Sequence, residues 1–142
     1  IELWLGGRVC SELRRAGRLG DGWLPSFTTP DEVAEGWQVV TASAAEHDRT
    51  IDPEHLGVLV PYAERELPEL MASFLAAQRP DVPVEAIVPV GPDALRRQLE
   101  AFIAVGASKF VVTPLDGAGP DQGSDWPARL VRLGDAVRDL EN

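Results

Sequence analysis

The stretch IELWLGGRVCSELRRAGRLGDGWLP, residues 1–25, decides how the fold is interpreted. An apolar run at residues 2–6 stops at Gly6-Gly7, and a second short apolar run follows at residues 20–25. Between them three apolar residues recur at the spacing of one helix face: Val9, Leu13 and Ala16. This order predicts a strand, a helix and a strand. Because the first residues already form a strand, with no initiator Met or leader, we expect residue 1 to lie partway through a larger fold.

The same alternation continues along the chain. Thr29-Pro30-Asp31-Glu32 carries three signals of a helix start: Thr as N-cap, Pro at the first helical position and Glu three residues after the cap. Further strands are expected at residues 56–62 and 108–113. Further helices are expected at 67–78, from Gly91 to a left-handed cap at Gly106, and near the C-terminus. An extended loop is expected at 79–91 and a polar loop at 116–125. Three of the expected helices have an apolar face that should be buried. These faces are Val33, Trp37, Val40 and Ala44 in the helix that starts at Pro30, Leu95, Leu99, Phe102 and Ile103 in the helix that follows Gly91, and Leu130, Leu133, Val137 and Leu140 in the C-terminal helix.

Four strand-and-helix units define the expected fold class, α/β. The strands are short apolar runs of the kind that is buried on both faces of a parallel sheet. Four such units are half of an eight-stranded barrel, which takes about 250 residues when complete. The 142 residues of this chain therefore suit either half a barrel or a small open α/β sheet.

The composition excludes several classes of partner. The formal net charge of -10 repels nucleic acid and anionic membranes, and no apolar run approaches the roughly 20 residues that cross a bilayer. The one cysteine, Cys10, cannot form an internal disulfide, which fits a reducing cytoplasm, and we expect it to be a small buried residue. Together with His47 and His55 it forms no spaced set of metal ligands, so no metal is expected.

Three segments carry a resemblance to a known family: LGG at residues 5–7, DGWLP at 21–25 and VGPDALRRQLEAFIAVGASKFVV at 90–112. In this order and spacing the chain resembles the C-terminal half of the luciferase-like monooxygenase family. The resemblance implies one domain, residues 1–142, that forms strands five to eight of a TIM-type (β/α)8 barrel. It also implies FMN or the deazaflavin coenzyme F420 as cofactor. The composition, rich in Ala, Arg and Asp, and the stretch SKFVV favour the deazaflavin.

The turn after the first strand is the candidate cofactor site. Free backbone N–H groups and the positive end of a helix can hold a phosphate there, and Arg8 adds a positive charge. The resemblance implies that this turn meets the cofactor phosphate, through Gly6, Gly7, Arg8, Val9 and Ser11. In the alternative interpretation the two glycines only allow a tight turn and Arg8 is solvated. Trp23 could line a barrel mouth, but a place in the core is favoured.

The sequence leaves two functions open. The first is a fragment or half-length member of the flavin- or deazaflavin-dependent oxidoreductases, whose intact enzyme would transfer hydride or oxygenate a small-molecule substrate. The second is a non-catalytic half-barrel that serves as an assembly module. No residue can be named as a catalytic acid or base, so whether this chain alone is an enzyme stays open. Unpaired strand edges and an open inner face predict a homodimer in either case.

Overall fold

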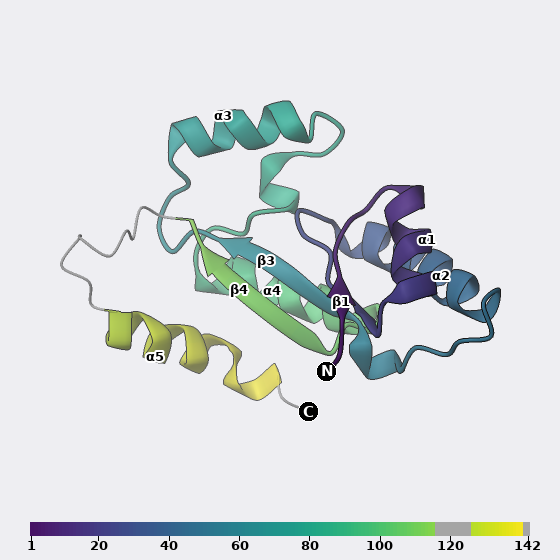
Figure 1. Ribbon diagram of the computed structural model, residues 1–142. Helices are drawn as coiled ribbons and strands as arrows, with labels where there is room; N and C mark the ends of the chain where they lie inside the picture. Colours follow the sequence, from purple (N-terminus) through teal and green to yellow (C-terminus); the bar gives the residue numbers. More distant parts are fainter. Residues whose placement is uncertain (116–125, 141–142) are drawn as a thin grey trace. The chain divides into compact units, whose positions relative to one another are not determined.

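The computed structural model describes residues 1–115 and 126–140 (Figure 1). Within it the chain forms two compact units. The first unit comprises Ile1–Val60 and Ala101–Val112, and the second comprises Pro61–Glu100 and Thr113–Asn142. The polar loop expected at 116–125 lies outside the described residues. In the described parts of the chain, no helix has the length and apolar character that crossing a bilayer requires.

Strands and helices alternate along the described chain, except that α3 and α4 follow one another between β3 and β4; the described residues also form three short 3-10 helices (η). The elements are β1 (Trp4–Leu5), α1 (Cys10–Leu19), β2 (Gly22–Trp23), α2 (Pro30–Ala45), η1 (Pro53–His55), β3 (Gly57–Tyr62), α3 (Glu69–Gln78), η2 (Val84–Ala86), α4 (Pro92–Ala104), β4 (Lys109–Pro114), α5 (Trp126–Val137) and η3 (Arg138–Leu140).

The strands pair in the order of the sequence. β1 and β2 are parallel, with Leu5 opposite Trp23, and two parallel bridges, one of them between Trp23 and Leu56, connect β2 to the start of β3. β3 pairs with β4. The chain is therefore α/β with parallel strands, as expected, although β1 and β2 are shorter than the runs at 2–6 and 20–25.

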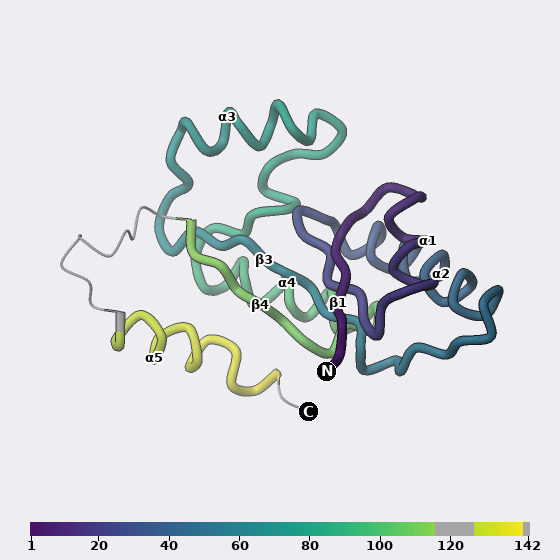
Figure 2. Tube along the Cα trace, in the orientation of Figure 1, coloured from purple at the N-terminus to yellow at the C-terminus, as the bar shows by residue number. Residues whose placement is uncertain are grey.

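One face of the sheet in the first unit is covered by helices. The Trp23 side chain is 1% exposed and lies against α2, where a Cβ added at Gly36 would overlap the Trp23 ring. α1 and α2 lie side by side (Figures 1 and 2), in such close contact that a Cβ at Gly17 would overlap the Val40 carbonyl oxygen. The small residues of these two helices thus allow them to form one layer on this face.

The opposite face of the same sheet is partly exposed to solvent. A Cβ at Gly57 would lie 2.9 Å from Leu24 Cδ1 and 3.0 Å from Trp4 Cζ3, so both side chains project from the face opposite Trp23. The Lys109 ammonium lies over the Trp4 ring, and because side chains alternate along a strand, Val111 projects from this face too. Val111 is 46% exposed. We call Trp4, Leu24 and Val111 the open face.

The start of α2 was predicted correctly, and the start of α1 was not. At α2, Thr29 Oγ1 accepts a hydrogen bond from Glu32 N and Glu32 Oε2 accepts one from Thr29 N, which confirms the expected capping box. At α1 the prediction for Val9 was wrong: Val9 is the N-cap, 53% exposed, and the helix begins one residue later. An apolar residue at helical spacing lies outside the core when it precedes the first turn.

The segment 79–91 was expected to be an extended loop, and most of it has no regular structure, but it is more ordered and more buried than expected. It contains the 3-10 helix η2, and Arg79, Ile87 and Val88 are at most 2% exposed. Figure 2 shows the chain turning back after α3 through this segment. The Asp81 carboxylate pairs with the Arg79 guanidinium at 2.8 Å, which offsets the cost of burying that charge.

The buried face was predicted largely correctly for α4 but not for all of α5. In α4, Leu95, Leu99 and Phe102 are buried as expected, and Gly106 has the left-handed φ of +100° that the expected cap requires. In α5, Leu130 was expected to be buried and is 58% exposed. The other residues of this expected face, Leu133, Val137 and Leu140, are half-buried. Two arginines of α5 also pair with Glu64 at 3.0 Å.

Candidate functional site

The turn between β1 and α1 has a tightly determined backbone. Gly7 has φ +108°, a conformation that a side chain rarely adopts, and a Cβ there would lie 2.6 Å from Glu12 Oε2. On the other side the Trp23 indole Nε1 donates a hydrogen bond to the Gly7 carbonyl oxygen at 2.9 Å. A buried ring and a folded-back carboxylate thus hold this glycine from two directions.

The carboxylate of Glu12 occupies the N-terminal end of α1. Its Oε2 accepts hydrogen bonds from Arg8 N at 2.9 Å and from Val9 N at 3.2 Å. These two bonds, that of Arg8 first, lower the pKa of Glu12 below its usual 4.5. The backbone donors that the sequence suggested for a phosphate are therefore engaged by the chain's own anion. Sequence reasoning missed Glu12, although a Glu three residues after the N-cap is the known signal.

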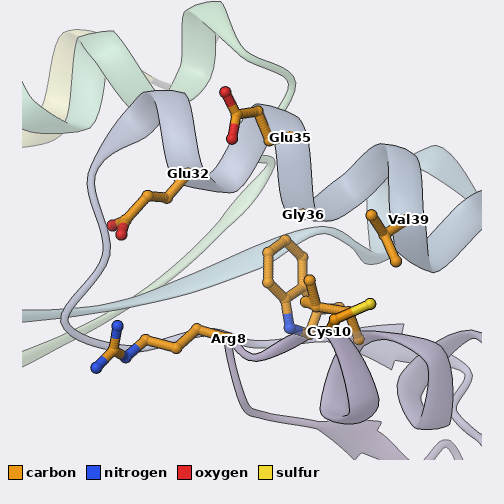
Figure 3. Close-up of a pocket in the computed structure, with 8 residues that line it drawn as sticks. Arg8, Cys10, Glu32, Glu35, Gly36 and Val39 are labelled. Carbon is orange, nitrogen blue, oxygen red and sulfur yellow. The ribbon is translucent and has the colours of Figure 1, made fainter.

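The other positions predicted for the cofactor lie on this turn, mostly at the surface. Gly6, Arg8, Val9 and Ser11 are exposed and Gly7 is half-buried. Among the described residues no hydrogen bond or ion pair engages the Arg8 guanidinium, which extends away from Cys10 in Figure 3. Among the described residues the turn therefore offers one uncommitted cation, Arg8, beside two backbone N–H groups that Glu12 engages.

A cavity of about 320 Å³ adjoins this turn (Figure 3). Its lining comes from the start of α1, from β2 and from the first turns of α2: Arg8, Cys10, Leu13, Trp23, Glu32, Glu35, Gly36 and Val39. Three charged residues, Arg8, Glu32 and Glu35, share this lining with apolar ones. Cys10 was expected to be buried and is exposed, because it is the first residue of α1 and lies at the cavity's rim.

The remaining sequence candidates have structural roles. Asp21 accepts a hydrogen bond from Leu3 N at 2.8 Å, and its other oxygen pairs with Arg49 at 3.3 Å. The Nδ1 atoms of His55 and His47 each lie 2.8 Å from a backbone carbonyl oxygen. In the described ranges no three His, Cys, Asp or Glu side chains come together as metal ligands. Trp23 is a core residue, as the sequence favoured.

The β1–α1 turn holds an anionic group of the chain itself, the Glu12 carboxylate. The space that a Cβ at Gly7 would fill holds a negatively charged oxygen, that of Glu12, which shows that the turn accommodates an anion. The exposed Arg8 guanidinium can supply a second contact. A phosphate oxygen can make the same two backbone hydrogen bonds once the Glu12 side chain withdraws.

The fold is shared with solved structures of F420- and FMN-dependent oxidoreductases. One is the coenzyme F420 dependent tetrahydromethanopterin reductase from Methanopyrus kandleri, with TM-score 0.61 and 16% identity over 94% of this chain and 49% of that chain. A second is an F420-dependent secondary alcohol dehydrogenase in complex with an F420-acetone adduct, with TM-score 0.60 and 13% identity over 80% of this chain and 43% of that chain.

A third structure with this fold binds FMN. It is the oxygenating constituent of the 3,6-diketocamphane monooxygenase from Pseudomonas putida, with TM-score 0.59 and 16% identity over 94% of this chain and 45% of that chain. The chain thus spans about half the length of the structures it matches. No protein-family model and no curated protein matches it. At these identities the likeness is one of fold, and at that level it confirms the resemblance seen in the sequence.

Proposed function

We propose that this chain forms the C-terminal half, strands five to eight, of the barrel of a luciferase-like oxidoreductase, as one domain over residues 1–142. The observation that carries the proposal is the fold shared with F420- and FMN-dependent structures over about half of their length. The order of LGG, DGWLP and the 90–112 segment supports it independently. The complete barrel would act on a small-molecule substrate in the cytoplasm.

The proposed cofactor is F420 or FMN, which supplies the hydride-transfer or oxygenation chemistry when it is bound. The part of this chain is to hold the phosphate. Arg8 N and Val9 N would donate to it, the Arg8 guanidinium would pair with it, and Gly7 would leave room for its oxygen. Gly6 and Ser11 complete the turn on either side.

Titration of the full chain with FMN and with F420 tests this function. We expect saturable binding of at least one of them, which Arg8→Glu weakens about tenfold or more through loss of a charge-assisted contact. Arg18→Glu, at the far end of α1, makes the same change in net charge and should leave the dissociation constant within about twofold. Equal effects of the two variants would show that Arg8 acts only through the overall charge.

The open face favours the second candidate function, an assembly module. Val111 is 46% exposed on it, whereas Val58 and Val60 on the covered face are 1% exposed. We propose that two copies pair through this face and the edges of β1 and β4, which would bury about 2,000 Å² or more in total. Sedimentation equilibrium should give about twice 15.4 kDa. A species of 15.4 kDa at all micromolar concentrations would refute the dimer.

A further inference from the structure

The turn from β2 to α2, Ser26–Thr29, lies at the carboxyl end of a parallel strand. In sheets of this kind ligands bind outside the carboxyl ends of the strands. β2 is the direct neighbour of β1: Leu24 N donates to Leu5 O at 2.9 Å, and a Cβ at Gly6 would lie 3.3 Å from Leu24 O. The β2–α2 turn therefore follows the same edge of the sheet as the β1–α1 turn.

Thr28 has a hydroxyl group without a protein partner. The residue is 3% exposed, and among the described residues none forms a hydrogen bond with Thr28 Oγ1. Helix capping does not account for this hydroxyl, because the next residue, Thr29, already caps α2. A valine would fill the same space without the cost of a buried, unsatisfied polar group. Within the described part of the chain nothing compensates the burial of this hydroxyl.

The residue before it is strained. Phe27 has φ +54°, in the left-handed region that bulky side chains rarely adopt. Strained backbone persists only where the surroundings fix it, and it occurs preferentially at ligand clamps and switch segments. Two adjacent residues, one with an unfavourable backbone conformation and one with an unsatisfied hydroxyl, therefore carry separate costs. One change in the conformation of the turn can relieve both.

We infer that the β2–α2 turn closes on the ligand held at the β1–α1 turn, with Phe27 leaving the left-handed region and the Thr28 hydroxyl forming a hydrogen bond to the ligand. The ligand class is one with a phosphate at one end and a polar, hydroxylated chain beside it. This inference rests on the proposed function and adds a binding residue to it.

The experiment compares Thr28→Val with Thr28→Ser in the full chain. Without ligand, Thr28→Val should raise the Tm, because the unsatisfied hydroxyl is gone. With FMN or F420 it should bind about three- to tenfold more weakly than the wild type, as the loss of one neutral hydrogen bond implies. Thr28→Ser keeps the hydroxyl and should bind within about twofold of the wild type.

A second readout follows the backbone directly. The NMR chemical shifts of Phe27 should move out of the left-handed range when FMN or F420 saturates the wild type. Unchanged shifts, or a Thr28→Val variant that binds as tightly as the wild type, would overturn the inference and leave an internal hydroxyl, or one satisfied by a buried water. If the wild type binds neither cofactor, the proposed function and this inference fall together. Wild-type binding that only Arg8→Glu weakens would sink the inference alone.

Discussion

The two strand-to-helix turns of the first unit solve the same structural problem in different ways. In the β1–α1 turn the unusual φ belongs to a glycine, Gly7, and the free backbone donors are satisfied by Glu12. In the β2–α2 turn the unusual φ belongs to Phe27, and the hydroxyl of Thr28 has no partner among the described residues. The first turn is locally satisfied and the second carries an unrelieved cost.

The difference teaches that a residue type alone does not reveal which turn is under strain. Gly-Gly draws attention in the sequence, yet it marks the relaxed turn, because glycine adopts a positive φ at little cost. The strained turn contains Phe27 and Thr28, which are unremarkable in the sequence. Four substitutions test this difference between the two turns. Their expected effects on stability decrease from Trp23→Phe, the largest, to Glu12→Gln, the smallest.

Trp23→Phe should have the largest effect. It removes the hydrogen bond to the Gly7 carbonyl, about 1 kcal/mol, and leaves a void against α2, about 1–2 kcal/mol more. Urea unfolding should therefore show the free energy of unfolding reduced by about 2–3 kcal/mol. Trp37→Phe, at a half-buried tryptophan of α2, is the control. Equal losses of unfolding free energy in the two variants would mean that the hydrogen bond from Trp23 to Gly7 does not add to the stability.

Gly7→Ala should destabilise the β1–α1 turn by about 1–3 kcal/mol, the cost of holding a residue with a side chain at such a φ. The added Cβ also displaces the Glu12 carboxylate, which lies 2.6 Å from that position. Gly134→Ala is the matched control, since nothing lies within 4 Å of a Cβ at Gly134. Thermal unfolding of both variants measures the difference, and no loss at Gly7 would show that the turn readily adopts another conformation.

Thr28→Val should have the opposite sign. Removal of the unsatisfied hydroxyl should raise the free energy of unfolding by about 1 kcal/mol. The neighbouring Thr29→Val removes a hydroxyl that caps α2 and should lower it by about 1 kcal/mol. Adjacent threonines are thus expected to respond in opposite directions in urea unfolding. A loss of stability in both would show that the Thr28 hydroxyl is satisfied in solution.

Glu12→Gln should have the smallest effect, and one that depends on pH. The folded-state pKa of Glu12 is lowered, so its contribution to stability is present above about pH 4.5 and is lost as the pH falls through the folded pKa. At neutral pH the variant should have the lower Tm, and the two curves should converge in acid. A gap that stays constant down to pH 2 would show that protonation of Glu12 is not the cause.

The parts of the fold that the sequence predicted correctly depend on local chemistry. The capping box at Thr29 and Glu32 and the left-handed cap at Gly106 are set by residues within a few positions of each other. The errors occurred where distant contacts decide. Leu130 stays exposed on α5, a helix that forms ion pairs to the distant Glu64, and Ile87 and Val88 of the expected loop are buried in the core.

The candidate site shows the same division. The position of the β1–α1 turn followed from the strand-and-helix pattern, and Gly7 does have a positive φ. That Glu12 engages its donors could have been inferred from the spacing to Val9. The orphan hydroxyl of Thr28 could not, because whether a buried group finds a partner depends on every element packed around it.

The contact between Trp23 and Gly36 has a consequence for evolution. The indole fills the space in which any β-carbon at position 36 would stand, so neither residue can change size alone without a loss of packing. Substitution at one site therefore depends on the other. In an alignment of related chains the two columns should covary: glycine at 36 should accompany tryptophan at 23, and alanine or serine at 36 should appear only with a smaller ring or an aliphatic side chain at 23.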